Sequence, residues 1–366
     1  MNALSKICTA VCFSCCYIFT LSACQQSPQY GYIEGETMGT SYHILYMEPS
    51  KADADDIKAA IDERLIQIND SMSTYQDNST ISTFNRLSAG QPLTVDPDFI
   101  KVLSVSKEVY TQSGGAFDPT VMPLVKAWGF GGKMTVDHLQ NPPTEQAIAA
   151  ANALIDFDGI KLSDNKLSKD KDGVALDFSA VAKGYGVDAI AGVLANDYKI
   201  TNYMVEIGGE VATSGVNDQQ RPWQIAIDAP LADSTVSNRK TIAVIRQPDH
   251  AEQQMHIATS GNYRNRVIFN GVSYSHTIDP ISGAPVRGGA PSVTVAADSV
   301  ALADAWATAL TAMPYEQALD VASQQNLAAL FVVPRAGLNT ETDNIEDWQV
   351  IETPAMEAFR RSNKAH

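Results

Sequence analysis

The segment at residues 177–185 reads DFSAVAKGY and joins two predicted elements. The run VALDF at 174–178 predicts a short strand, and the small and apolar residues that follow predict a helix over residues 179–194. A helix N-terminus presents free backbone N–H groups to an anion, and Lys183 lies about one turn into this helix, where it can meet a phosphate. Asp177 in front of the helix suits a plain capping role equally well. The spacing of a Walker phosphate-binding loop is absent.

Helical patterns dominate the chain before this junction. Apolar residues at positions 57, 61, 65, 68 and 72 recur at helical spacing and predict an amphipathic helix. Further helices are expected at 98–111, which ends at a Ser-Gly-Gly sequence, and at 144–154, which follows a Pro-Pro pair. β-Branched and aromatic residues predict one strand at 39–47.

Strand patterns dominate the chain after the junction. The expected strands are 203–211, 223–227, 241–245, 255–258, 266–269, 272–276 and 292–295. Helices at 299–313 and 315–324 and a hydrophobic strand at 327–333 follow. Many strands in succession, with helices grouped before and after them, predict an α+β fold. We expect one compact unit of two lobes, with antiparallel or mixed sheets flanked by helices.

The composition narrows the class of protein. The 366 residues include 42 Asp and Glu against 26 Lys and Arg, which gives a net charge of -16. A surface this acidic repels phosphate backbones, so we expect no nucleic-acid partner. A phosphate ligand would need local help from backbone amides, a placed lysine or a metal ion.

The N-terminus carries an export pattern. All 5 cysteines lie at or before Cys24, and residues 7–23 form an uncharged, largely apolar run after a lysine. The run suits a signal-peptide core, and its end, LSAC at 21–24, resembles the lipobox of bacterial lipoproteins. An uncleaved anchor or a plain secretory signal are the alternatives. We expect a signal peptide at 1–23, a tether at 24–30 lipidated on Cys24, a folded domain at 31–350 and a C-terminal tail at 351–366.

Asp304 and Thr308 form the first candidate site after the junction. Their i, i+4 spacing places both oxygens on one face of the predicted helix 299–313. A carboxylate beside a hydroxyl suits Mg²⁺, which takes hard oxygen ligands. The alternative is a polar stripe in which Thr308 bonds back to the carbonyl one turn earlier.

A second candidate is His276 in the sequence HTIDPISG at 276–283. A histidine at the end of a strand is a plausible general base, although a single histidine is more often structural. Asp279 before a proline is typically a turn former. Glycine-rich turns at 114–120, 206–210 and 259–263 can bring the backbone close to a ligand.

Taken in order, these segments resemble the ApbE family of FAD:protein FMN transferases. The resembling motifs are ETMGT at 36–40, MSTY at 72–75, GAFDP at 115–119, DFSAVAKGY at 177–185, EIGGE at 206–210, TSGNY at 259–263, HTIDPISG at 276–283 and DAWAT at 304–308. The resemblance implies a T-fold-related ApbE-like domain that binds FAD, uses Mg²⁺ and transfers the FMN half to a Ser or Thr hydroxyl, releasing AMP.

The resemblance also implies roles for single residues. His276 should be the catalytic base. The backbone carbonyl of Ala180, with Asp304 and Thr308, should hold Mg²⁺. The residues implied to contact FAD are Met38, Tyr75, Ala116, Phe117, Asp118, Asp177, Lys183 and Ile278.

The implied acceptors are redox subunits of membrane complexes, such as sodium-pumping NADH:quinone reductase and related electron-transfer complexes. We therefore expect the protein on the periplasmic side of a bacterial inner membrane, held by its lipid anchor. Two other functions stay open at this point: a FAD pyrophosphatase that gives FMN and AMP, and a non-catalytic FAD-binding lipoprotein.

Overall fold

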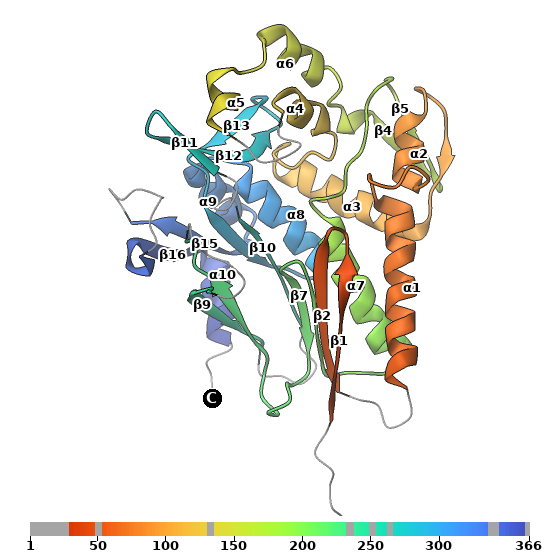
Figure 1. The fold of residues 1–366 in the computed structure, drawn as a ribbon, viewed down its shortest axis with the longest axis vertical. Coiled ribbons are helices and arrows are strands. Elements are labelled where there is room, and N and C mark those ends of the chain that lie inside the picture. Colours follow the sequence, from red (N-terminus) through yellow and green to blue (C-terminus); the bar gives the residue numbers. More distant parts are fainter. Residues whose placement is uncertain are drawn as a thin grey trace, which may run out of the picture.

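The computed structural model describes the chain from residue 29 to residue 362 with a few gaps (Figure 1). The predicted signal peptide, Cys24 and most of the tether lie outside the described residues. So do the last two residues of the TSGNY motif, while of His276 only the backbone is described. The described ranges are 29–47, 53–129, 135–231, 238–248, 254–261, 266–335 and 344–362.

A large antiparallel sheet runs through the centre of the molecule. Within the described residues it has 8 strands in the order β1-β2-β6-β7-β10-β14-β15-β16, and every neighbouring pair is antiparallel. The strands are β1 (Tyr30–Thr37), β2 (Thr40–Met47), β6 (Tyr203–Ile207), β7 (Glu210–Ser214), β10 (Gln254–Gly261), β14 (Ser292–Ala296), β15 (Ala328–Pro334) and β16 (Trp348–Glu352).

Both faces of this sheet are buried. In β15, Phe331 and Val333 pack among helices, whereas Leu330 and Val332 join a separate core on the opposite face. This alternation is what a pleated strand between two cores requires. Helices cover one face: α1 (Ala54–Met72), α3 (Pro97–Gln112), α7 (Ala182–Gly192), α8 (Val300–Thr311) and α9 (Tyr315–Gln324). The hairpin of β8 (Gln224–Asp228) and β9 (Thr241–Arg246) covers the other with α10 (Pro354–Ser362).

A smaller group of elements lies at the top of Figure 1. Its own core contains Leu124, Trp128, Ala151 and Ile278. It is built from α4 (Met122–Ala127), α5 (Val136–Gln140), α6 (Glu145–Asn152), β11 (Arg266–Phe269), β12 (Val272–Asp279) and β13 (Ala284–Arg287). Beside it lie α2 (Thr80–Arg86), β3 (Leu93–Thr94), β4 (Ile160–Ser163) and β5 (Lys166–Lys169).

Two details of the predicted junction are wrong. Residues 174–178 form no strand, because side chains occupy their backbone groups: Asn85 pairs with both the N–H and the C=O of Leu176, and Lys169 donates to the carbonyl of Val174. The predicted helix 179–194 begins at Ala182, after a turn in which the amide of Val181 donates to the carbonyl of Phe178. Its end is a π-helical turn, Val193–Asp197.

The predicted strand 203–211 is two strands, β6 and β7. Gly208 and Gly209 between them have φ of +63° and +108°, which only glycine adopts readily, so the chain reverses there. Folded structure also continues past residue 350: β16 ends at Glu352, and Met356 of α10 is fully buried. Among the described residues, no helix combines the length and the apolar character that a membrane crossing requires.

Candidate functional site

The site is built where α7 crosses α8. The amide of Gly184 in α7 donates to Asp304 Oδ2 in α8 at 3.0 Å. In return, the two carboxylate oxygens of Asp188 in α7 accept from the amides of Val300 and Ala301, both at 2.9 Å. Each helix therefore satisfies free N–H groups in the first turn of the other. A Cβ on Gly184 would lie 2.5 Å from the carbonyl oxygen of Val300, so the two helices approach each other only because this residue is glycine.

This crossing holds a buried charge cluster, which we call the Lys183 cluster: Lys183, Glu210 and Asp304. Lys183 Nζ lies 2.8 Å from Glu210 Oε1 and 3.7 Å from Asp304 Oδ2. Glu210 comes from β7, directly after the Gly208–Gly209 turn, and is 2% exposed, while Asp304 is 1% exposed. Glu210 is a residue that sequence reasoning did not single out. Its only signal was its place at the end of the EIGGE motif.

Burial dominates the electrostatics of the Lys183 cluster. It raises the pKa of Asp304, and with the charge of Asp304 it raises the pKa of Glu210 to about 8. Burial alone would lower the pKa of Lys183, but the two carboxylates outweigh it and raise that pKa. Glu210 Oε2 is buried and has no hydrogen-bond partner among the described atoms. Such an orphaned oxygen is costly unless a cation or donor meets it.

The residues around this cluster fit a hard divalent cation. Thr308 lies one turn after Asp304 in α8, and its hydroxyl lies 3.3 Å from the hydroxyl of Ser260 in β10. Ala180 belongs to the turn that precedes α7. In the described part of the chain, no three His, Cys, Asp or Glu side chains gather into a metal site. The available donors are two carboxylates, a hydroxyl and backbone oxygen, which is the chemistry that Mg²⁺ accepts when it keeps several waters.

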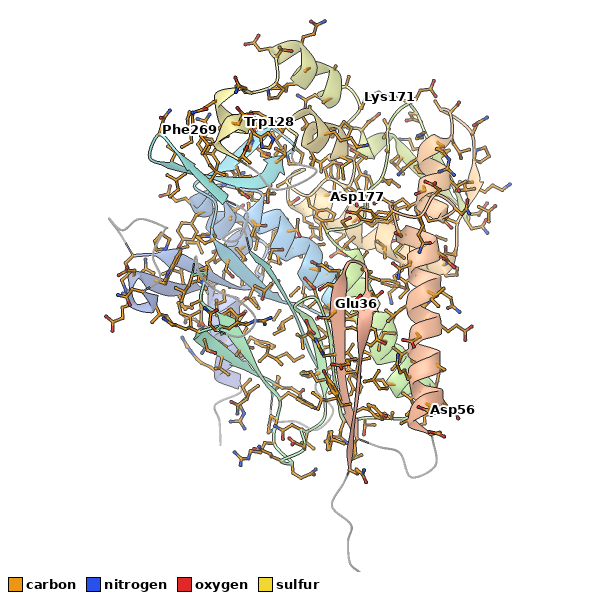
Figure 2. All side chains as sticks on the ribbon, viewed as in Figure 1. Glu36, Asp56, Trp128, Lys171, Asp177 and Phe269 are labelled. Atoms are coloured by element: carbon orange, nitrogen blue, oxygen red, sulfur yellow. The ribbon has the colours of Figure 1, made fainter. Side chains whose placement is uncertain are left out.

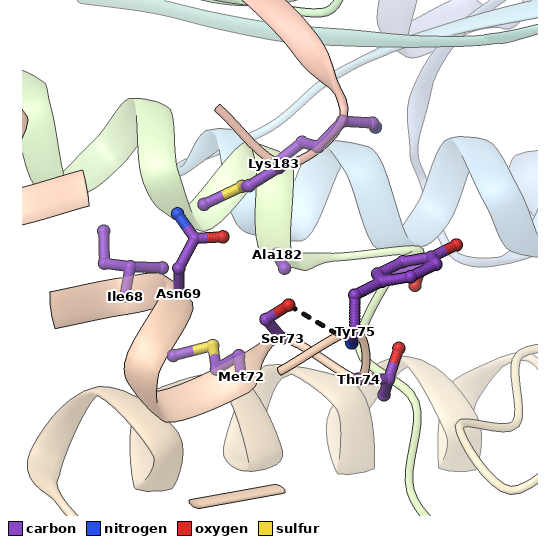
Figure 3. Close-up of a pocket in the computed structure, with 10 residues that line it drawn as sticks. Ile68, Asn69, Met72, Ser73, Thr74, Tyr75, Ala182 and Lys183 are labelled. Atoms are coloured by element: carbon purple, nitrogen blue, oxygen red, sulfur yellow. Dashed lines mark hydrogen bonds between the residues drawn. The ribbon is translucent and has the colours of Figure 1, made fainter. Parts of the chain in front are cut away.

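Three of the predicted FAD contacts line one pocket (Figure 3): Met38, Tyr75 and Lys183. Met38 has φ of +51° in the tight turn between β1 and β2, and Tyr75 is 94% exposed after the end of α1. The pocket thus lies between a strand turn, the end of α1 and the start of α7. Lining residues that sequence reasoning did not single out are Ile68, Asn69, Met72, Ser73, Thr74, Ser179 and Ala182.

Asp118 and Asp177, the predicted acidic contacts, lie on loops that touch each other. The amide of Asp177 donates to the carbonyl of Pro119 at 2.8 Å (Asp177 is labelled in Figure 2). Asp177 Oδ1 accepts from the amide and the hydroxyl of Ser179, so this carboxylate shapes the turn before α7 and is not the N-cap of the helix. Asp118 Oδ1 accepts from the amide and hydroxyl of Thr120, and burial raises the pKa of Asp118.

The remaining predicted residues are placed differently. Ala116 and Phe117 are each 3% exposed and pack in the main core, and Ile278 packs in the upper core with Trp128. Among the described residues, no contact joins these three to the pocket of Met38. His276 lies in β12, and its side chain is outside the described part of the structure.

The turn after β12 agrees with its predicted role. Asp279 Oδ1 accepts from the amide of Ile281 at 2.9 Å, so Asp279 forms the turn. The indole of Trp128 donates to the carbonyl of Gly283 at 2.8 Å and fixes this turn against α4.

A family model matches residues 38–331, and this range contains the pocket and the Lys183 cluster. The model is that of the ApbE family. The chain belongs to the ApbE family. The predicted family resemblance is therefore confirmed.

Curated relatives and solved structures agree with this assignment. The chain is 37% identical over 317 residues to the FAD:protein FMN transferase of Vibrio cholerae, covering 86% of this chain and 91% of the relative. It is 36% identical over 321 residues to the protein of that name from Haemophilus influenzae, covering 86% and 89%. The solved flavin transferase ApbE of Vibrio cholerae superposes with a TM-score of 0.75 at 32% identity, over 91% of this chain and 99% of that one. The apo flavinyl transferase ApbE of Pseudomonas stutzeri gives 0.74 at 29% identity, over 91% and 97%. These superpositions confirm the predicted fold class.

Proposed function

We propose that this chain transfers the FMN moiety of FAD to the hydroxyl of a Thr or Ser residue in an acceptor protein and releases AMP. The observation that carries the proposal is the Lys183 cluster beside the pocket of Met38 and Tyr75. An acidic protein needs local positive charge to bind a pyrophosphate, and this cluster supplies a buried ammonium at the mouth of a helix. The curated relatives named above carry this activity in their names.

Mg²⁺ is the cation that the donor set suits. Asp304, Thr308 and the carbonyl of Ala180 would hold it, and the orphaned Oε2 of Glu210 faces the same cluster. When bound, it would neutralise charge that develops on the pyrophosphate oxygens. Lys183 would add a second positive charge there, and Glu210 would keep its ammonium in place.

The transfer itself needs a proton acceptor. The acceptor hydroxyl oxygen bonds to the phosphorus of the FMN half, the bond from that phosphorus to the AMP phosphate breaks, and AMP leaves with the bridging oxygen. A neutral hydroxyl is a poor nucleophile, so His276 would take its proton during attack, which typically contributes about 10²–10⁴-fold. The product is a phosphoester, so no covalent intermediate on this chain is required.

The rest of the FAD molecule would extend from the Lys183 cluster into the pocket. Met38 and Tyr75 offer apolar and aromatic surface for a flavin or adenine ring. The remaining FAD contacts that we propose are Ala116, Phe117, Asp118, Asp177, Lys183 and Ile278.

The location belongs to the same proposal. A diacylglycerol on Cys24 would anchor the folded domain at the periplasmic side of the inner membrane. Membrane redox subunits, such as those of sodium-pumping NADH:quinone reductase, would be the acceptors there.

Mass spectrometry tests the proposal. The full-length protein is incubated with FAD, Mg²⁺ and a soluble domain of such a redox subunit. The expected result is a gain of one FMN on a Thr or Ser, with release of AMP, abolished by EDTA and by His276→Ala. Free FMN and AMP without labelled acceptor would indicate a pyrophosphatase. Retained FAD without either product would indicate a binding protein, and both results would contradict the proposal.

A further inference from the structure

Strand β8 borders a polar hollow of about 450 Å³ on the sheet face opposite α7 and α8. Four consecutive residues of this strand, Ile225, Ala226, Ile227 and Asp228, line the hollow. Side chains of a strand alternate between its two faces, so consecutive residues border one hollow through the edge of the strand. The hollow therefore faces the backbone of β8.

The hydrogen bonds of the hairpin identify which backbone groups lie on this edge. The carbonyl of Trp223 accepts from Gln247, and the amide of Ala229 donates to Lys240, so residues of this parity face β9. The alternate residues between them, including Ala226, direct their N–H and C=O groups away from β9. In the described ranges, the hairpin is a two-stranded sheet and no strand pairs with the outer edge of β8.

The opposite wall of the hollow touches the Lys183 cluster. Thr40 and Gly208 line the hollow, and a Cβ on Gly208 would lie 2.8 Å from Thr40 Cγ2 and 3.3 Å from Lys183 Cδ. Lys183 also lines the pocket of Met38 and Tyr75. One layer of residues thus separates two hollows, with the lysine reaching both sides of the turn.

Strand β10 connects the hollow to the rest of the site in the same way. Thr259 and Gly261 line the hollow, and Ser260 between them contacts the hydroxyl of Thr308. Displacement at phosphorus requires the attacking oxygen and the leaving oxygen to lie roughly in line, on opposite sides. If FAD occupies the pocket of Met38, the attacking hydroxyl has to arrive from another side, and the hollow provides one.

We propose that an extended segment of the acceptor protein docks in this hollow as an added strand on the free edge of β8. Its Thr or Ser side chain then passes Gly208 toward the Lys183 cluster. Main-chain pairing gives such a segment affinity that depends little on its sequence, and the polar lining, with carboxylates of Glu206 and Asp228, selects among side chains. This inference rests on the function proposed above, because it needs a protein acceptor.

Ala226→Pro tests the inference. Ala226 is exposed and its N–H points away from β9, so proline there removes an edge donor and narrows the hollow without breaking a bond inside the hairpin. Val244→Pro is the matched control. Val244 pairs with Ala226 across the hairpin, is equally exposed, and lies on the outer edge of β9, away from the hollow.

The assay uses the full-length variants with FAD, Mg²⁺ and the same acceptor domain. Ala226→Pro should lower kcat/KM for the acceptor about tenfold through KM, the equivalent of one or two lost hydrogen bonds, while FAD binding and melting temperature match those of Val244→Pro. Equal effects of the two prolines, or none, would overturn the docking proposal.

Two further results have a defined meaning. If the parent protein transfers no FMN, the proposed function fails, and that result is separate from any difference between the prolines. If Ala226→Pro changes a dimer into a monomer in sedimentation while transfer is unchanged, the edge belongs to a second copy of this chain and the docking proposal is wrong.

Discussion

The Lys183 cluster and the pocket of Met38 and Tyr75 are neighbours built in opposite ways. The cluster lies between two helices that satisfy each other's free amides, and Asp304 and Glu210 are almost completely buried. The pocket is lined by a strand turn and by the segment after α1, where Tyr75 is 94% exposed. The phosphate end of the site is therefore preformed in the fold, whereas the ring end relies on exposed side chains that a ligand would cover.

This difference predicts how substitutions divide. Changes in the helix crossing should affect stability or metal-dependent chemistry strongly, because buried polar groups there have no alternative partners. Changes in the pocket should affect ligand binding and leave the fold intact. The following predictions test that division, beginning with the largest expected effect.

Asp304→Asn should lower the rate of FMN transfer about a hundredfold and raise the Mg²⁺ concentration needed, because an amide is a poorer ligand for a hard cation than a carboxylate. An asparagine oxygen still accepts from the amide of Gly184, so the fold should persist. Transfer rates over a magnesium titration, with circular dichroism as the control, measure this. An unchanged magnesium requirement would remove Asp304 from the metal site.

Gly184→Ala should destabilise the protein by about 1–3 kcal/mol, since the new methyl group would overlap the carbonyl of Val300. Gly192→Ala in the same helix is the matched control. A Cβ there would meet only Asn196 Nδ2 at 3.7 Å, so this change should be neutral or stabilise by up to about 1 kcal/mol. Denaturant unfolding compares the two. Equal free energies of unfolding would show that the helix crossing tolerates expansion.

Asp188→Asn should cost about 1 kcal/mol of stability, because an amide side chain can accept from only one of the two amides that the carboxylate now satisfies. Thermal unfolding measures the loss. The magnesium requirement of transfer should rise with it if the reciprocal caps set the distance between the two helices. A stability loss at an unaltered magnesium requirement would limit Asp188 to a structural role.

Tyr75→Ala should leave stability within about 0.5 kcal/mol of the parent, as expected for an exposed side chain. It should weaken FAD binding several-fold, in line with the loss of about 0.5–1.5 kcal/mol of aromatic contact. Quenching of FAD fluorescence measures the dissociation constant. Unchanged FAD affinity would place the ring elsewhere.

The regular elements of the fold could be predicted from local patterns. Helix α1 and helix α8 begin and end close to the predicted residues, because their apolar periodicity is set by one buried face. Strands β4, β5 and β16 were not predicted. They are short or half-exposed, and their partners come from distant parts of the chain, which no local pattern reports.

The errors at the junction have a specific cause. The apolar run at 174–178 looks like a strand, but Asn85 and Lys169, far away in the sequence, supply its hydrogen bonds. Glu210 illustrates the same limit at the site. Its role follows from a contact with Lys183 across 27 positions of sequence, whereas Asp304 and Thr308 were recognisable from their helical spacing alone.

The central claim is that the α7–α8 crossing is the metal and phosphate end of the site. A crystal structure of the protein with FAD, and with Mn²⁺ in place of Mg²⁺, tests it most directly. We predict an anomalous peak within coordination distance of the Asp304 carboxylate and the Thr308 hydroxyl, with the pyrophosphate next to Lys183. An anomalous peak elsewhere, or a pyrophosphate remote from Lys183, would contradict the account.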